Sequence, residues 1–216
     1  MLPLQRVKPP AMGMLPQDVQ RDIRAIWKSH AAALEEAKAF LFSMGKENVI
    51  RDACRSSTVG KLLPTDLYVH TSAVDELPPV LRLLLFAVRQ VVGEVEHDLV
   101  KVALDGRSVS LLAYPGFDDD PHPALVQSVR VDLGRAQYQV RRYATAENPA
   151  ILHRKDAFVT RDYPLYEQFR SLSEAEARAG LLSRSEIGRR QQWEALLVEN
   201  GWRIERHSLV VGSGPS

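Results

Sequence analysis

The fold is decided by residues 99–114, LVKVALDGRSVSLLAY. Two strand-like runs, Leu99–Leu104 and Ser108–Tyr114, flank the turn pair Asp105-Gly106, and this pattern is a strong signal for a β-hairpin. A second pair of runs, 126–133 and 135–143, predicts another hairpin. Short strands joined by tight turns pair in the antiparallel direction, because parallel strands need long crossovers. The sequence therefore predicts an antiparallel sheet of about four strands.

Helical patterns precede the strands. Apolar residues recur at helical spacing between Pro16 and Gly45, which predicts one long amphipathic helix. A short helix is expected at about 47–55. Another is expected at about 79–92, where Gly93 can end it. Because the helix at 79–92 is apolar on most sides, we expect it at the centre of the core.

Helical signals return after the strands. Ser173 and Glu176 have the spacing of a capping box at the start of a helix. A later helix is expected at about 186–200, followed by a last strand or wing at 202–210. The predicted fold is therefore α+β, with N-terminal and C-terminal helices packed against the sheet.

The predicted domain organisation is simple. Prolines without apolar periodicity predict a loose N-terminal arm, and small residues predict a fraying tail. The expected parts are the arm at 1–14, a single α+β domain at 15–210 and the tail at 211–216. Within the domain we expect a helical part at 15–93, a strand-rich part at 98–143, and helices with a wing at 160–210.

Composition and charge exclude several classes of protein. The chain is 45% apolar and 25% charged, which is typical of a soluble globular protein. Its 28 Lys and Arg against 27 Asp and Glu argue against coating nucleic acid by charge alone. Cys54 is the single cysteine, and the first residues lack the apolar core of a secretory signal, so we expect a cytoplasmic location. The longest apolar run, 80–92, is too short to span a membrane, so no membrane partner is expected.

An acidic loop lies between the two predicted hairpins. Its sequence is Asp118-Asp119-Asp120-Pro121-His122-Pro123. Carboxylates and imidazoles are metal ligands, and with His153 they could bind a divalent ion that supports hydrolysis. The alternative is a solvated turn in which the aspartates bond to nearby backbone amides. The candidate catalytic residues are Asp118, Asp120, His122 and His153, and the candidate metal ligands are Asp118, Asp120 and His122.

A basic segment, His153-Arg154-Lys155, follows the Asn148-Pro149 break. Proline restricts the backbone here, which predicts an extended connector with outward side chains. Together with Arg141, this segment could contact phosphates, because guanidinium forks match phosphate oxygens and lysine adds a point charge. The alternative is a set of solvated charges that pair with nearby aspartates.

Two arginines, Arg189 and Arg190, stand at the start of the last predicted helix. A helix start lined with arginines and followed by a strand pair could enter a nucleic-acid groove. The alternative is that Trp193 and its apolar neighbours form the buried face of this helix.

Four segments resemble parts of one known group of proteins. They are 59–70 (VGKLLPTDLYVH), 114–125 (YPGFDDDPHPAL), 148–155 (NPAILHRK) and 187–193 (IGRRQQW). In this order they resemble the C-terminal region of bacterial DNA phosphorothioation-associated putative methyltransferases, over roughly residues 15–210. The resemblance implies a setting of DNA modification and anti-phage defence, in which sulfur replaces a non-bridging phosphate oxygen. Those proteins also carry an N-terminal S-adenosylmethionine domain with a glycine-rich loop, which the glycines of this chain do not form, so we do not expect it to methylate by itself.

Three hypotheses follow. In the leading one, the chain is a nucleic-acid-binding accessory module of a defence system, and it contacts phosphates of DNA or RNA through Arg141, His153, Arg154, Lys155, Arg189 and Arg190. In the second, it is a metal-dependent nuclease or phosphodiesterase that uses the acidic loop and His153. In the third, it docks on a separate methyltransferase or nuclease chain through the 16–43 helix. No cofactor is expected, except a divalent metal under the second hypothesis.

Overall fold

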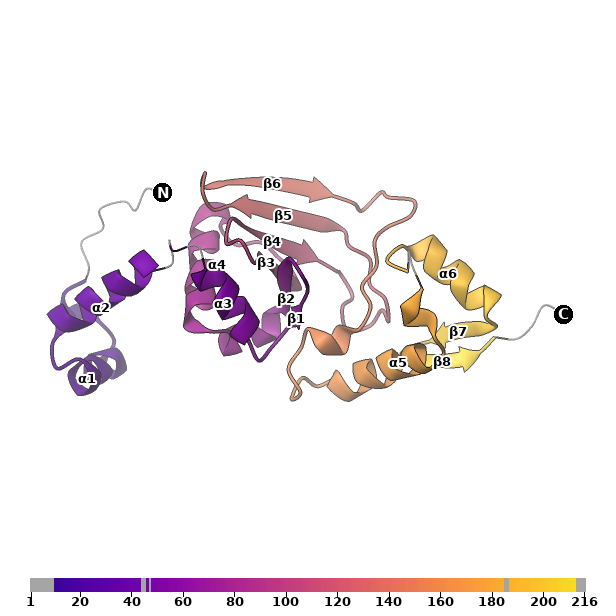
Figure 1. Cartoon of the computed structure of the whole chain (residues 1–216), viewed down its shortest axis with the longest axis horizontal. Coiled ribbons are helices and arrows are strands. Elements are labelled where there is room, and N and C mark those ends of the chain that lie inside the picture. The colour runs from indigo at the N-terminus through magenta and orange to yellow at the C-terminus, as the bar shows by residue number, and fades with distance from the viewer. Residues whose placement is uncertain (1–9, 44–45, 47, 185–186, 213–216) are drawn as a thin grey trace.

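Six strands form one antiparallel sheet, in which each strand pairs with the next along the chain (Figure 1). The computed structural model describes residues 10–43, 46, 48–184 and 187–212. Both predicted hairpins are confirmed, as β3–β4 and β5–β6. The strands are β1 (Lys61–Leu62), β2 (Asp66–His70), β3 (Leu99–Ala103), β4 (Ser108–Ala113), β5 (Gln127–Asp132) and β6 (Gln137–Arg142).

The expected count of about four strands is too low because β1 and β2 extend the sheet beyond β3. With two residues, β1 is too short to show an alternating pattern. Gly60, just before it, has a φ of +86°, and a Cβ there would lie 2.5 Å from the Tyr68 carbonyl oxygen. A glycine is therefore required for the chain to pass this close to β2.

The turn between β3 and β4 depends on its Asp-Gly pair. The Asp105 carboxylate accepts a hydrogen bond from the Arg107 backbone N–H at 2.9 Å. Gly106 has a φ of +69°, the left-handed region that glycine enters freely. A Cβ on Gly106 would lie 3.2 Å from the Ile50 side chain, so the helix that carries Ile50 lies against this turn.

The described residues contain six α-helices. They are α1 (Gln17–Ile26), α2 (His30–Ser43), α3 (Val49–Ser56), α4 (Pro79–Val92), α5 (Tyr166–Arg178) and α6 (Arg190–Glu199). The prediction of one long helix from Pro16 is wrong, because Lys28 has a φ of +63° and separates α1 from α2. The expected helix end at Gly45 lies outside the described residues.

One face of the sheet carries the main core. The helices α3 and α4 supply Ile50, Cys54, Leu81 and Val88, all buried, to a cluster with the inward side chains of β2 to β5. The expected central position of α4 is confirmed. The strand residues of this cluster are Leu67, Val69, Val100, Val102, Val109, Leu111, Val129 and Val131.

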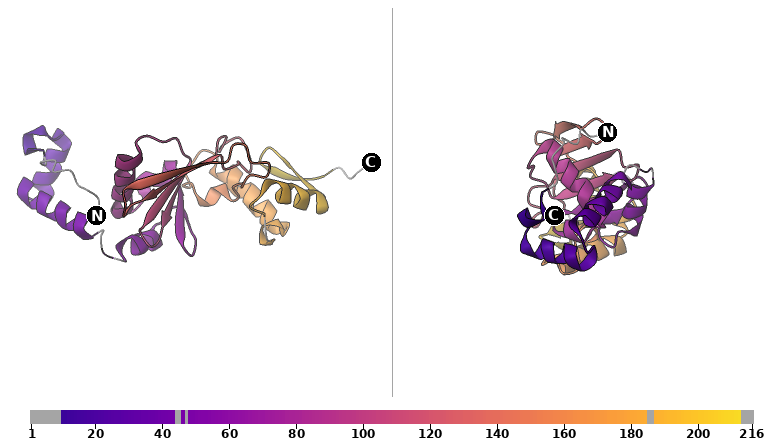
Figure 2. Two further views of the ribbon diagram at one scale, coloured as in Figure 1. Left: turned by 90° about the horizontal axis from the view of Figure 1, so that it is seen from above. Right: turned by 90° about the vertical axis from the view of Figure 1, so that its left-hand side faces the viewer.

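The N-terminal pair α1 and α2 stands apart from this core. Figure 1 and the left-hand view of Figure 2 place α1 and α2 beside each other and away from the sheet. In α1, Ile23 is the buried residue, and Ile26 is 65% exposed. The predicted packing of N-terminal helices against the sheet is therefore confirmed for α3 and α4. Residues 1–9 of the expected arm lie outside the described part, and Met12–Met14 forms a short 3-10 helix.

The C-terminal part adds α5, α6 and a second, two-stranded sheet of β7 (Trp202–Glu205) and β8 (Ser208–Val211), which is the expected wing. The capping-box prediction is wrong, because Ser173 and Glu176 lie inside α5 and are buried. The last helix begins at Arg190, and residues 185–186 and 213–216 lie outside the described chain. Within the described part, no helix has the length and apolar character needed to cross a membrane.

Candidate functional site

Buried polar side chains gather where four separate segments meet: the β4–β5 loop, the connector after β6, α5 and the β7–β8 turn. His122, Lys155, Glu176 and His207 are at most 7% exposed, and His153 is partly buried beside them. We call these five residues the polar cluster. Burying so many polar groups is costly unless they hydrogen-bond to one another.

Lys155 is directed inward, and the predicted outward orientation is wrong. Its Nζ donates hydrogen bonds to the carbonyl oxygens of Phe117 at 2.6 Å and Asp120 at 2.7 Å. The Nε2 of His207 lies 2.9 Å away and completes the three partners that an ammonium group can serve. Burial lowers the pKa of Lys155 to about 8, against the opposing effect of the acidic loop. A lysine so fully occupied cannot contact a phosphate.

The backbone explains this inward turn. Arg154 has a φ of +56° and a ψ of +53°, a left-handed conformation that is uncommon for a residue with a Cβ. The chain then enters a 3-10 helix at Lys155–Ala157. Arg154 itself stays exposed, so of the three basic neighbours it alone is presented to solvent. The proline-based prediction of an extended connector did not foresee this kink.

His122 and Glu176 form the closest pair of the polar cluster. Their Nε2 and Oε1 atoms lie 2.7 Å apart, and both side chains are at most 5% exposed. The His122 ring also lies 4.6 Å from the His153 ring, measured between centroids. Sequence reasoning selected both histidines but took Glu176 for part of a helix cap. The buried face of α5, with Phe169 and Leu172 also inward, was the signal that could have found it.

His153 has one satisfied and one unsatisfied ring nitrogen. Its Nε2 donates to the carbonyl oxygen of Ile187 at 2.8 Å, while its Nδ1 is buried without a partner among the described residues. Burial, aided by the nearby His122, lowers the pKa of His153 to about 4. The ring is therefore neutral at pH 7, with a lone pair on Nδ1.

The predicted metal ligands do not meet as expected. Asp118 accepts a hydrogen bond from the Tyr163 hydroxyl at 2.7 Å. The carboxylate of Asp120 accepts from the His122 backbone N–H at 2.9 Å and from Arg190 at 3.2 Å, as in the solvated-turn alternative. Among the described residues, the group of three candidate ligands within 4.8 Å of one another is His122, His153 and Glu176.

The arginines at the start of α6 are only partly available. Arg190 is committed to the Asp120 carboxylate and to the His122 carbonyl oxygen, at 3.0 Å for the latter. Arg189 is exposed and donates to the Asn148 carbonyl oxygen at 3.1 Å. Trp193 is 2% exposed, as the buried-face alternative required. The start of α6 is thus mainly a packing element.

The face of the large sheet opposite α3 and α4 buries Leu99 and Leu112 in a second apolar cluster. Its remaining, open part carries a row of cations that sequence reasoning largely missed. Cross-strand pairing places Lys101 opposite Ser110, and Ser110 opposite Arg130, on one face of the sheet. Arg141 pairs with Ser128, which lies two residues before Arg130 on the same strand, so Arg141 belongs to the same face. Arg130 and Arg141 are exposed. Lys101 could have been found from the alternation of β3, where it is the one charged residue among apolar neighbours.

A hollow of about 420 Å³ opens at one end of this face. Its basic residues are Arg51 and Arg55 from α3, with Lys101 and Arg130 from the sheet. Asp66 and Asp105 also line it, and Asp66 pairs with Lys101 at 3.3 Å. The four cations exceed the two carboxylates, so an anion is the favoured occupant. We call the four basic residues of this hollow, together with Arg141, the basic face.

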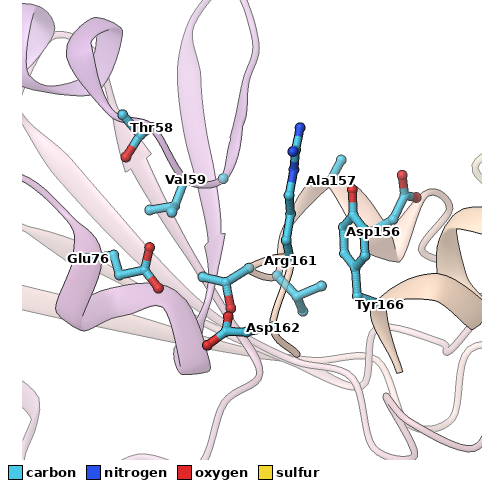
Figure 3. Close-up of a pocket in the computed structure, with 11 residues that line it drawn as sticks. Thr58, Val59, Glu76, Asp156, Ala157, Arg161, Asp162 and Tyr166 are labelled. Carbon is cyan, nitrogen blue, oxygen red and sulfur yellow. The ribbon is translucent and has the colours of Figure 1, made fainter. Parts of the chain in front are cut away.

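A second open pocket, of about 570 Å³, has the opposite character (Figure 3). Three carboxylates, Glu76, Asp156 and Asp162, line it with a single guanidinium, Arg161. This excess of negative charge disfavours a phosphate. The pocket shares none of its lining residues with the polar cluster, so its size alone gives no reason to connect it with the buried histidines.

Comparisons with protein-family models, with curated proteins and with solved structures find no significant match to this chain.

Proposed function

We propose that this chain is a nucleic-acid-binding accessory module of a bacterial DNA modification and anti-phage defence system. The setting comes from the sequence resemblance described above, and the binding surface comes from the basic face. In this proposal methyl transfer belongs to another protein or domain, and the module acts in the cytoplasm on DNA or RNA.

The observation that carries the proposal is the row of cations across the open face of the sheet. Arg130 and Arg141 stand on neighbouring strands, are exposed, and face the same side. The ion pairs found among the described residues include neither of them. Arginine side chains in this situation can give bidentate hydrogen bonds to phosphate oxygens.

The proposed contacts differ from those expected from sequence. Lys155 and His153 leave the set because they belong to the polar cluster, and Arg190 is held by Asp120. Arg141, Arg154 and Arg189 remain as exposed candidates. The basic face adds Arg51, Arg55, Lys101 and Arg130. Phosphate contacts of this kind position a backbone and do not read bases.

A titration of the purified chain against fluorescent DNA and RNA oligonucleotides, with and without phosphorothioate links, tests this function. Contacts to about four phosphates of duplex DNA predict a loss of roughly 100-fold in affinity between 50 and 200 mM salt. Replacing Arg130 and Arg141 by alanine is expected to weaken binding at least tenfold and to flatten this salt dependence.

The matched control is the double variant Arg82→Ala/Arg89→Ala. Both arginines are exposed on α4, which covers the other face of the sheet, so the net charge changes equally. This variant should bind within twofold of the natural chain. Equal losses in both double variants, or an affinity that ignores salt, would remove the basic face as a binding surface.

A second candidate function is docking on a separate methyltransferase or nuclease chain. The supporting observation is the α1–α2 pair, which lies apart from the core and exposes Val19 and Ile26. Deleting residues 1–43 should then abolish a stoichiometric complex with such a chain and leave oligonucleotide binding unchanged. The metal-dependent nuclease alternative is tested in the same titration by adding magnesium, manganese or zinc and following cleavage.

A further inference from the structure

We infer that His122, His153 and Glu176 form a zinc site inside the polar cluster. The inference does not depend on nucleic-acid binding, because the basic face and the polar cluster share no residue. It also departs from the acidic loop, since it replaces Asp118 and Asp120 by Glu176, which the sequence pattern had assigned to a helix cap.

His153 has the geometry of a metal ligand. A histidine that binds a metal through one ring nitrogen usually donates from the other to a carbonyl or carboxylate, which fixes its tautomer. Here Nε2 donates to the Ile187 carbonyl oxygen at 2.8 Å. Nδ1 is left with a buried lone pair and no protein partner among the described residues. A buried acceptor without a donor is unfavourable, and a cation would satisfy it.

The buried carboxylate of Glu176 needs a positive charge nearby to compensate its own. Its carboxylate is 1% exposed, and its ion-pair partner in the described structure is His122. Lys155 lies in the same cluster, but its Nζ is occupied by two carbonyl oxygens and His207. A buried carboxylate whose one partner is an imidazole is poorly compensated unless that imidazole is protonated. A divalent ion would supply the missing charge and leave the histidine neutral, as coordination requires.

The distances suit a small tetrahedral ion. Zinc binds nitrogen and oxygen ligands at about 2.0–2.2 Å, so two ligand atoms on one tetrahedral zinc lie about 3.3 Å apart. In this structure, the ligand atoms of His122, His153 and Glu176 all lie within 4.8 Å of one another, and His122 Nε2 lies 2.7 Å from Glu176 Oε1. These separations bracket the required value, so shifts of side chains of about 1 Å would complete the site.

The donor set selects the metal. Two imidazoles and one carboxylate match the His₂Glu ligand set of zinc enzymes, whereas magnesium and calcium prefer oxygen ligands and water. Three protein ligands leave one tetrahedral position for water or another small ligand. The indole of Trp193 lies 4.9 Å from the His122 ring and 4.6 Å from the His153 ring, and its buried N–H finds no acceptor in the part of the chain that the structure describes. An oxygen in the fourth position is the kind of acceptor that this N–H lacks.

The test uses the full chain, stripped of metal by a chelator and titrated with Zn²⁺, Co²⁺ or Mg²⁺. We expect one equivalent of zinc by calorimetry, cobalt absorption of tetrahedral intensity, and no uptake of magnesium. His153→Ala should weaken zinc binding at least 100-fold. The control His97→Ala removes a histidine outside the polar cluster, whose Nδ1 bonds to the Val95 carbonyl oxygen, and should bind zinc like the natural chain.

A second variant keeps the test decisive if His153→Ala does not fold. Glu176→Gln preserves the shape of the side chain and a hydrogen-bond partner for His122, but it removes the charge that a zinc ligand set uses. We expect a folded protein with zinc affinity lowered at least tenfold. The inference is overturned if the natural chain takes up no zinc, or if Glu176→Gln binds zinc as tightly as the natural chain, which would indicate adventitious surface binding.

Discussion

The Nζ of Lys155 lies 2.9 Å from the Nε2 of His207, and this contact ties the connector after the large sheet to the turn of the small one. The same ammonium group also holds the carbonyl oxygens of Phe117 and Asp120 and lies 4.0 Å from the centre of the Phe169 ring. One side chain therefore joins the acidic loop, the connector, α5 and the wing.

Replacing Lys155 by methionine should lower the free energy of unfolding. Methionine has a similar length but no donors, so two buried carbonyl oxygens and His207 would each lose a partner. An unsatisfied buried group costs about 1–3 kcal/mol, so a total of roughly 2–4 kcal/mol is expected after local relaxation. Urea unfolding followed by circular dichroism measures it. The exposed neighbour gives the control, since Arg154→Met should change stability by less than about 1 kcal/mol. A stable Lys155→Met protein with weakened oligonucleotide binding would instead favour the contact role expected from sequence.

Acid should destabilise the fold through His70. This residue is 7% exposed, stacks on Phe117 at 4.3 Å between ring centroids, and accepts a hydrogen bond from the Ser72 backbone N–H. Burial lowers the pKa of His70 to about 4, while the unfolded chain keeps a value of about 6.5. The unfolded state thus binds a proton first, so stability is present above pH 6.5 and is lost as the pH falls toward 4. The loss is about 3 kcal/mol at most.

The matched measurement compares the natural chain with His70→Asn between pH 7 and 4.5. Asparagine can still accept from Ser72 as a cap but does not titrate. The variant should be less stable at pH 7, because it loses ring packing, and should show a shallower decline with acid. Parallel pH profiles of the two proteins would mean that folding does not lower the pKa of His70.

Gly60→Ala should disturb the start of the sheet. The φ of +86° is strained for alanine, and the added Cβ would lie 2.5 Å from both the Tyr68 carbonyl oxygen and the Val69 side chain. We expect a loss of roughly 2–4 kcal/mol in unfolding free energy, from strain and overlap together. Gly93→Ala is the comparison, because it has a similar φ of +73° but open space around its Cβ, and should cost less. Equal losses of unfolding free energy in the two variants would show that backbone strain alone accounts for the effect.

Cys54 should be unreactive in the folded protein. Its side chain belongs to the main core, at 1% exposure, and burial raises its thiol pKa to about 12. Since the thiolate is the reacting form, a thiol reagent at pH 8 should label the chain only after denaturant is added. Rapid labelling without denaturant would mean that α3 opens readily from the sheet.

Local patterns predicted the parts of this fold that depend on local chemistry. The Asp105-Gly106 turn, the apolar character of α4 and the two hairpins all follow from residues close in sequence. The break at Lys28 and the short β1 were not predicted, because neither carries a turn residue or an alternating pattern that sets it apart. The number of strands was underestimated because neither β1 nor β2 was predicted.

The candidate site was predictable only in part. His122 and His153 were selected for their chemistry, but the partner of His122 is 54 residues away on α5, and no spacing rule connects them. Lys155 was placed outside because Pro149 predicted an extended connector with outward side chains, whereas here three acceptors from other segments draw it inward. Arg130 and Lys101 were overlooked because their common face exists only once the strands are paired.

The contact between Lys155 and His207 also sets an order of assembly during synthesis. The strands of the large sheet pair in the order in which they leave the ribosome, so each new hairpin can add to an existing edge. The polar cluster cannot close until His207, the last of its five residues in the sequence, has emerged. Until then the lysine, the glutamate and the two histidines remain hydrated, so the sheet should form first and the site last.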